Sequence, residues 1–189
     1  MVGRGIYTNI IDRSYDKFLP EESEWVKKNE YVAPEQIVEL FKQHNSNYQD
    51  DKILDAGCGT GAVAKLLNAK NLYGIDNHYG SLKLSQFSGL YEELFQDDLN
   101  NKLYFKDNEF DHIICCGTFT HDHVKPHALK EFVRIAKKTI CISINFDYYH
   151  EEKFEETIKN LPIEEMDFFR GDYIRKLKRD AYYGIYKVL

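Results

Sequence analysis

The chain has 189 residues, of which 43% are hydrophobic and 30% are charged, as expected for one soluble globular domain with a sizeable core. Its formal net charge of −6 argues against a general affinity for phosphate backbones, which requires a basic face. The basic cluster at 170–179 contains Asp172 and precedes Asp180, so we expect a solvated surface there and no nucleic-acid partner.

The cysteines show neither a disulfide framework nor the paired spacing of metal ligands. They are Cys58, Cys115, Cys116 and Cys141. The N-terminus lacks the apolar run of a signal peptide, and no segment reaches the length of a membrane span. We therefore expect a cytoplasmic protein with reduced thiols, no bound metal and no membrane partner. The oligomeric state stays open.

The first quarter of the chain is predicted to be mostly helical. Residues 8–19 and 21–44 have a largely helical pattern, and Pro34 followed by Glu35 is typical of the first turn of a new helix. Ile37, Leu40, Phe41 and His44 then fall on one helical face.

The rest of the chain alternates strands and helices. Strands are predicted at 52–56, 72–76, 91–96, 110–116, 139–145, 166–169 and 181–188. Helices are predicted at about 61–68, 81–88, 126–136 and 151–160, with Val63, Leu66 and Leu67 as the buried stripe of the first. This alternation predicts an α/β, Rossmann-like three-layer sandwich around a mostly parallel sheet. Ligands of such sheets bind at the carboxyl ends of the strands.

A glycine-rich turn follows the first of these strands. Asp55 is followed by Gly57, Gly59 and Gly61 at alternate positions, and a helix begins near Ala62. Glycine has no Cβ, so such a turn lets backbone N–H groups approach a ligand closely. A dinucleotide fingerprint is G-x-G-x-x-G, whereas the third glycine here comes one residue early. The alternative is a tight strand-to-helix turn with no ligand.

This turn resembles motif I of the class I S-adenosylmethionine-dependent methyltransferases, on the segment Leu54-Asp55-Ala56-Gly57-Cys58-Gly59-Thr60-Gly61. The resemblance implies that the loop, including Cys58, passes under the methionine part of S-adenosylmethionine. It also implies that Asp55 lies near the ammonium group, directly or through water. The family fold has seven strands, of which the last runs antiparallel.

Asp76 ends the second predicted strand and is the candidate ribose ligand. A carboxylate at that point can accept hydrogen bonds from both ribose hydroxyls, as an acidic residue does in the methyltransferase family. We expect Asn77 to lie at the cofactor beside it. The alternative is that Asp76 merely begins a turn.

The third predicted strand resembles a methyltransferase subgroup that reads Gly-x-Tyr-x-x-Leu before Asp-Leu. On that register Asp98 accepts a hydrogen bond from the adenine amino group, and the amide of Leu99 faces the adenine ring. Asp97 is the alternative adenine ligand. His78 departs from the family, which often has a small hydroxyl residue at that position.

The segment after the fourth strand resembles the Williams–Beuren syndrome methyltransferase-like group. It reads Gly117-Thr118-Phe119-Thr120-His121-Asp122-His123-Val124, after Cys116, which we also expect at the cofactor. His121 is a tentative general base for an oxygen or nitrogen nucleophile. The alternatives are that His121 packs on the cofactor or caps the helix near Pro126. The His-x-His run is too local to favour a metal site.

The N-terminal helices are the candidate lid over the cofactor, so we expect one domain, 1–189, with a lid at 1–48 and a cofactor-binding core at 49–189. Tyr15 lies in Ser-Tyr-Asp-Lys, which resembles the N-terminal Tyr-Asp segment of many such enzymes and makes Tyr15 a weak cofactor contact. An aromatic core is the alternative for this segment.

The resemblance implies transfer of a methyl group from S-adenosylmethionine to an oxygen, nitrogen or sulfur atom of a small molecule, with S-adenosylhomocysteine as the product. Strand four is not followed by the Asn/Asp-Pro-Pro-Tyr/Phe loop typical of methyltransferases that act on exocyclic amines and glutamine. A protein methyltransferase and a non-catalytic S-adenosylmethionine-binding module are the alternative hypotheses.

Overall fold

The structure is a computed structural model that describes residues 6–8, 24 and 26–189. Most of the helix expected at 8–19, with Tyr15, lies outside the described residues. Thr8, the first residue of that expected helix, is instead the last residue of a short strand.

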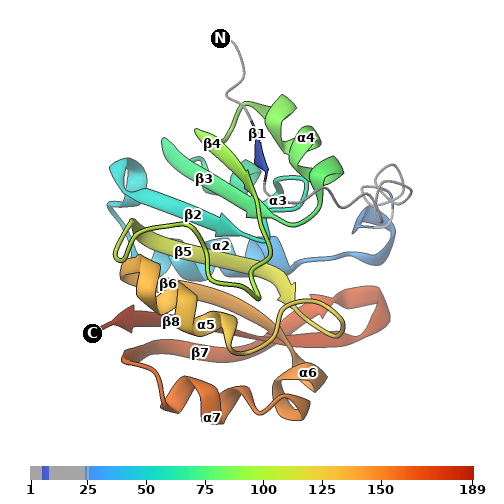
Figure 1. Cartoon of the computed structure of the whole chain (residues 1–189). Helices are drawn as coiled ribbons and strands as arrows, with labels where there is room; N and C mark the ends of the chain where they lie inside the picture. The colour runs from blue at the N-terminus through green and yellow to red at the C-terminus, as the bar shows by residue number, and fades with distance from the viewer. Residues whose placement is uncertain (1–5, 9–23, 25) are drawn as a thin grey trace.

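An eight-stranded sheet runs through the described part of the chain (Figure 1), in the order β1-β4-β3-β2-β5-β6-β8-β7. Its strands are β1 (Ile6–Thr8), β2 (Lys52–Ala56), β3 (Asn71–Asp76), β4 (Glu93–Gln96), β5 (Phe110–Phe119), β6 (Ala136–Asn145), β7 (Ile163–Ile174) and β8 (Arg179–Val188). The neighbours from β1 to β6 pair in parallel, and β8 is antiparallel to both β6 and β7. The seven predicted strands and the antiparallel last strand are confirmed, and β1 adds an eighth.

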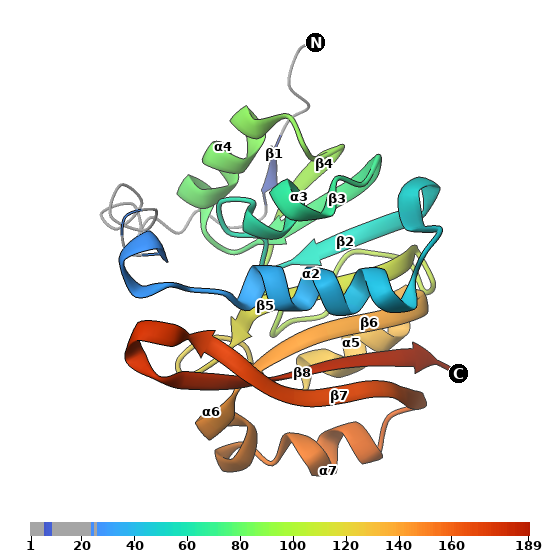
Figure 2. The ribbon, with the colours of Figure 1, turned by 180° about the vertical axis from the view of Figure 1, so that it is seen from behind.

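Helices cover both faces of this sheet (Figures 1 and 2). They are α2 (Ala33–His44), α3 (Ala62–Leu67), α4 (Tyr79–Ser88), α5 (Ala128–Ile135), α6 (Phe146–Glu151) and α7 (Phe154–Lys159), with single 3₁₀ turns η1 (Tyr48–Asp50) and η2 (Arg175–Leu177). Figure 2 shows α2 and α3 in front of the sheet, and Figure 1 shows α5 on the opposite face. The three-layer prediction is therefore confirmed.

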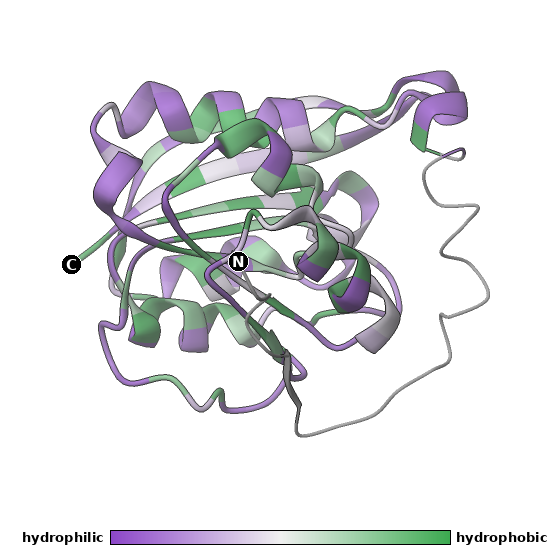
Figure 3. Cartoon of the chain, turned by 90° about the horizontal axis from the view of Figure 1, so that it is seen from above, coloured by the Kyte–Doolittle hydropathy of each residue, from purple (hydrophilic) through white to green (hydrophobic). Residues whose placement is uncertain are grey.

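Two apolar cores separate on the two faces because successive residues of a strand point in opposite directions. Ile113 packs with Phe132 of α5, whereas its neighbour Ile114 packs with Ile37 and Phe41 of α2. The expected apolar face of α2 is confirmed at Ile37, Leu40 and Phe41, and Pro34 lies in its first turn as predicted. Along the helices, hydrophilic and hydrophobic residues alternate, as Figure 3 shows. The helix α2, which belongs to the proposed lid, packs against the sheet through its hydrophobic residues.

Two sequence predictions about helices are wrong. Leu66 is 37% exposed, and the buried face of α3 is formed by Val63, Ala64 and Leu67, so Ala64 takes the place expected for Leu66. The helix expected at 151–160 begins late, as α7 at Phe154, and the preceding α6 is not predicted. Lys153 separates the two helices, because its backbone is left-handed with φ of 52°. A regular α-helix cannot continue through that conformation.

Candidate functional site

The glycine loop leaves β2 at the carboxyl edge of the sheet, between β3 and β5, where the strand order reverses. Its first two amides, those of Gly57 and Cys58, donate to the Ile75 carbonyl oxygen of β3 at 2.8 and 3.0 Å. Gly57, Gly59 and Gly61 all have positive φ, of 75°, 50° and 84°. Glycine tolerates this backbone, which explains the alternation.

Two of the loop glycines face different surroundings. A Cβ added to Gly57 would collide with the Thr118 hydroxyl of β5, whereas a Cβ added to Gly59 would meet no described heavy atom within 4 Å. The loop is thus pressed against β5 at its start and open at its middle. The open side is where a ligand could approach the backbone.

Asp55 is the most enclosed acidic group of the site, with 1% of its surface exposed. Its Oδ2 accepts a hydrogen bond of 2.7 Å from the Tyr91 hydroxyl, and its Oδ1 has no hydrogen-bond partner among the described residues. Burial raises the pKa of Asp55 to about 7, opposed by the Tyr91 hydrogen bond and assisted by the nearby charge of Asp76. A buried carboxylate in this state is suited to a cation that supplies donors to Oδ1.

Asp76 ends β3 and links three elements. Its two carboxylate oxygens accept from the amides of Gly59 and His78, each at 2.8 Å. The Ser85 hydroxyl of α4 donates to the Gly59 carbonyl at 2.7 Å, which ties the loop to that helix. Burial raises the pKa of Asp76, and these backbone hydrogen bonds act against the rise. A carboxylate has about four lone-pair sites, so two are left for a ligand's hydroxyls.

His78 is buried and caps α4, where its Nδ1 accepts from the Ser81 amide at 3.2 Å. The imidazole therefore caps the N-terminus of the helix, as the side chain of a small hydroxyl residue at the same position can. Asn77, its exposed neighbour, accepts a hydrogen bond of 2.9 Å from the Gln96 side chain on its carbonyl oxygen.

The two candidates for the adenine contact lie side by side after β4. Asp97 Oδ1 accepts from the Asp98 amide at 2.8 Å, and Asp98 Oδ1 accepts from the Asn100 amide at 2.9 Å. Both carboxylates are half-buried, so both alternatives stay open. Leu99 is buried in the core and anchors this turn.

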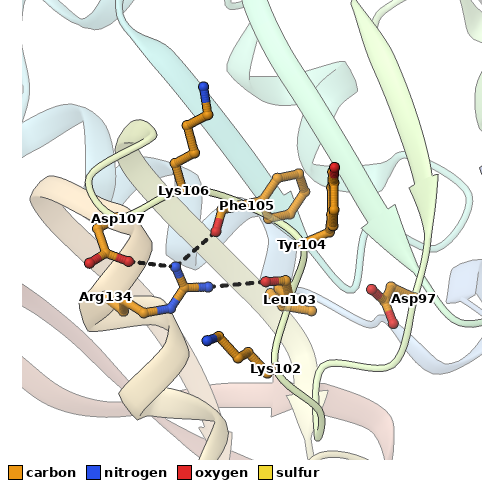
Figure 4. A pocket seen from close by; sticks show the side chains of 8 residues that line it. All are labelled: Asp97, Lys102, Leu103, Tyr104, Phe105, Lys106, Asp107 and Arg134. Carbon is orange, nitrogen blue, oxygen red and sulfur yellow. Dashed lines mark hydrogen bonds and ion pairs between the residues drawn. The ribbon is translucent and has the colours of Figure 1, made fainter.

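A surface pocket of about 610 Å³ lies beside Asp97 (Figure 4). The loop 102–107 and the Arg134 side chain of α5 line it. The guanidinium donates to the carbonyl oxygens of Leu103 and Phe105 and to the carboxylates of Glu131 and Asp107. These bonds occupy the donors of Arg134, so the group anchors the loop and is not free to hold an anion.

Cys116 lies at the far side of the glycine loop, in β5. Its Sγ is 3.8 Å from the Tyr31 hydroxyl, and the Gly117 amide donates to Ser143 Oγ at 2.9 Å. Tyr31 also meets Tyr173 of β7 edge-on, with 5.2 Å between ring centroids. Burial raises the pKa of Cys116 to about 12, so this thiol is a poor nucleophile.

His121 lies in the turn after β5 and is 49% exposed. Its Nε2 is 2.7 Å from Glu151 Oε2 of α6, and its ring lies 5.1 Å from that of Tyr148. The capping alternative is wrong, because the N-cap residue of α5 is His127. Within the described residues no cluster of three or more His, Cys, Asp or Glu side chains is placed to hold a metal ion. Among the described helices, none is both long and apolar enough to cross a membrane.

The structure brings Asp55, the glycine loop and Asp76 together, as the sequence predicts. Sequence reasoning missed the contacts of Tyr91 and Tyr173. Tyr91 was visible as part of the Gly-x-Tyr pattern, but its bond to Asp55 spans 36 residues and has no local signal. Tyr173 reaches the site because the β7–β8 hairpin folds back beside Tyr31.

Comparisons with known proteins find a matching domain model, two related chains and a similar solved structure. A methyltransferase domain model matches residues 54–141. An uncharacterised protein of Methanocaldococcus jannaschii is 32% identical over 82% of this chain and 70% of its own length. Human methyltransferase-like protein 27 is 30% identical over 78% of this chain and 64% of its own length. Magnesium protoporphyrin IX methyltransferase of Synechocystis PCC 6803, solved with bound S-adenosylmethionine, has a TM-score of 0.71 over 96% of this chain and 99% of its own, at 16% identity.

Proposed function

The chain belongs to the class I S-adenosylmethionine-dependent methyltransferases, and we propose that it methylates an oxygen, nitrogen or sulfur atom of a small molecule. Within the class, we propose membership of the Williams–Beuren syndrome methyltransferase-like group. The Gly117–Val124 segment and the 30% identity to human methyltransferase-like protein 27 support this placement. This chain spans 64% of the length of that relative.

The proposal rests on one observation. The carboxylates of Asp55 and Asp76 and the open glycine loop lie together at the carboxyl edge of the sheet, where the strand order reverses. Asp55 presents a buried Oδ1 that has no hydrogen-bond partner among the residues the structure describes, and this oxygen fits an ammonium group. Asp76 keeps acceptor capacity for two hydroxyls, and Gly59 leaves space beside its backbone. These features fit S-adenosylmethionine, which supplies a methyl group already activated on a sulfonium.

The chain's own part in the reaction is to bind, orient and exclude water. Fixed geometry is worth about 7–11 kcal/mol of a displacement barrier, so no catalytic triad is needed. Cys58, Asn77, Leu99 and Cys116 are proposed to border the cofactor, with Asp98, or Asp97, at the adenine. Tyr15 remains a weak proposed contact outside the described residues.

His121 is the proposed general base for a protonated acceptor. Glu151 Oε2 lies 2.7 Å from its Nε2, and this contact orients the ring. The ring's partial exposure allows contact with an acceptor that enters from solvent.

One class of protein acceptor, glutamine, is disfavoured because the segment after Cys116 reads Gly-Thr-Phe. It therefore lacks the Asn/Asp-Pro-Pro-Tyr/Phe loop that is typical of glutamine methyltransferases.

The test supplies the purified chain with methyl-labelled S-adenosylmethionine and a cell extract separated into small-molecule and protein fractions. We expect label to be transferred in the small-molecule fraction and lost with Asp76→Ala. Label confined to the protein fraction would favour the protein methyltransferase. Cofactor binding with no transfer to either fraction would favour the non-catalytic module.

A further inference from the structure

The contact between Asp55 and Tyr91 is built into the centre of the proposed cofactor site. Tyr91 stands just before β4 and reaches back under the glycine loop, where its hydroxyl donates to Asp55 Oδ2 at 2.7 Å. The second oxygen, Oδ1, is buried without a hydrogen-bond partner in the described part of the chain. Tyr91 thus fixes one oxygen of the carboxylate, and the other oxygen is available to a ligand.

The Tyr91 ring packs between Gly74 and Gly61, and the absence of a Cβ on Gly74 gives the ring room. A Cβ on Gly74 of β3 would lie 3.0 Å from Tyr91 Cε1, and a Cβ on Gly61 would lie 3.5 Å from Cε2. The ring is therefore held between the strand and the loop, and its hydroxyl has a fixed direction.

No cationic group acts on Asp55 among the described residues. The titratable groups that influence it are the Tyr91 phenol, the Asp76 carboxylate and the thiols of Cys58, Cys115 and Cys116. All of these are neutral or negative, so none of the described groups that influence Asp55 supplies a positive charge to compensate its ionised form. Desolvation then favours the protonated form, and its pKa of about 7 is the result.

We propose that Asp55 and Tyr91 form a proton-linked amine site, in which Asp55 carries a proton in part of the free protein near neutral pH and releases it when the ligand's ammonium group binds. Tyr91 is a positioning residue, because it acts through Asp55 by holding Oδ2 and aiming Oδ1 at the amine. The inference rests on the proposed function. The proton moves from the carboxyl group to solvent as the ammonium arrives, and no other bond forms or breaks.

The first experiment measures S-adenosylhomocysteine binding to the full chain by calorimetry between about pH 6 and pH 8, in two buffers of different ionisation enthalpy. We expect the Kd to be about tenfold higher at pH 6 than at pH 8, with proton release on binding near pH 7. The probe 5′-methylthioadenosine, which lacks the amino acid part, should bind without this pH dependence.

Two variants and one control test whether Tyr91 positions Asp55 or only supports the fold. Tyr91→Phe removes a hydrogen bond that favours the ionised form of Asp55, so the midpoint of the pH dependence should move to higher pH. Asp55→Asn should bind weakly with no pH dependence. Tyr73→Phe, which removes a phenol from β3 further from the loop, should leave the midpoint where the wild type has it.

Each other outcome has a distinct meaning. Tight binding of S-adenosylhomocysteine with a flat Kd and no proton release overturns this inference and leaves the proposed function standing. Equal loss of affinity at every pH in Tyr91→Phe, with an unmoved midpoint, overturns the positioning role. Failure of the folded wild type to bind S-adenosylhomocysteine at any pH overturns the inference and the proposed function together.

Discussion

Gly57 and Gly59 share a left-handed backbone but have different neighbours, so one residue type has two uses in the same loop. At Gly57 the absent Cβ lets the loop lie against the Thr118 hydroxyl. At Gly59 the absent Cβ leaves space that no described atom fills, while its amide donates to Asp76. The first glycine therefore serves the packing of the loop, and the second serves the approach of a ligand.

Alanine at these two positions should separate stability from binding. We expect Gly57→Ala to lower the free energy of unfolding by about 2–4 kcal/mol, from left-handed strain and the collision with Thr118. Gly59→Ala should cost about 1–2 kcal/mol, from strain alone, and yet weaken S-adenosylhomocysteine binding strongly. Chemical denaturation and calorimetry measure the two quantities.

Thr118→Ala is the control for the first substitution. It removes the hydroxyl that a Cβ on Gly57 would meet, so it should restore part of the stability lost in Gly57→Ala. Equal costs for the two glycine substitutions, with no rescue by Thr118→Ala, would contradict this division of roles.

At the level of elements, the carboxyl edge is held together by ties between segments far apart in sequence. The Asp76 carboxylate joins the end of β3 to the glycine loop, and Ser85 joins that loop to α4. On the other face, Arg134 of α5 holds the loop 102–107 that follows β4. The proposed adenine side is therefore shaped by α5 as well as by its own strand.

Arg134→Lys should loosen this loop. A lysine supplies a point charge and cannot reach two carbonyl oxygens and two carboxylates at once, so we expect a loss of about 1–3 kcal/mol in stability. Amide hydrogen exchange should become faster in residues 102–107. Lys130→Ala, an exposed change on the same helix, should alter neither quantity. Unchanged exchange in Arg134→Lys would refute the anchoring role.

At the scale of the whole molecule, the sequence predicts the layers and the position of the site because both follow from local patterns. Alternating apolar strands and amphipathic helices specify a covered sheet, and the glycine loop locates its binding edge. Asp55 and Asp76 could be located because they lie at the carboxyl ends of two strands that pair in parallel.

The remaining features depend on contacts that no local pattern encodes. Lys153 breaks the helix expected at 151–160 although lysine is a good helix former, because the chain turns there between α6 and α7. The pairing of Asp55 with Tyr91, and of His121 with Glu151, joins segments at least 30 residues apart. Such pairs are decided by how the elements pack, which a single sequence does not display.

The central claim is that this chain binds S-adenosylmethionine at the loop between Asp55 and Asp76. The most direct measurement is calorimetric titration with S-adenosylmethionine and S-adenosylhomocysteine, with NAD as the control ligand. The variant Asp76→Ala and the exposed control Asp50→Ala are titrated in parallel, and circular dichroism verifies that each is folded.

We expect micromolar Kd values for both sulfur ligands and no binding of NAD. Binding should be weakened at least tenfold in Asp76→Ala, because a charge-assisted contact worth about 1.5–3 kcal/mol is lost, and unchanged in Asp50→Ala. Absence of binding to the folded wild-type chain, or equal affinity in Asp76→Ala, would contradict the account.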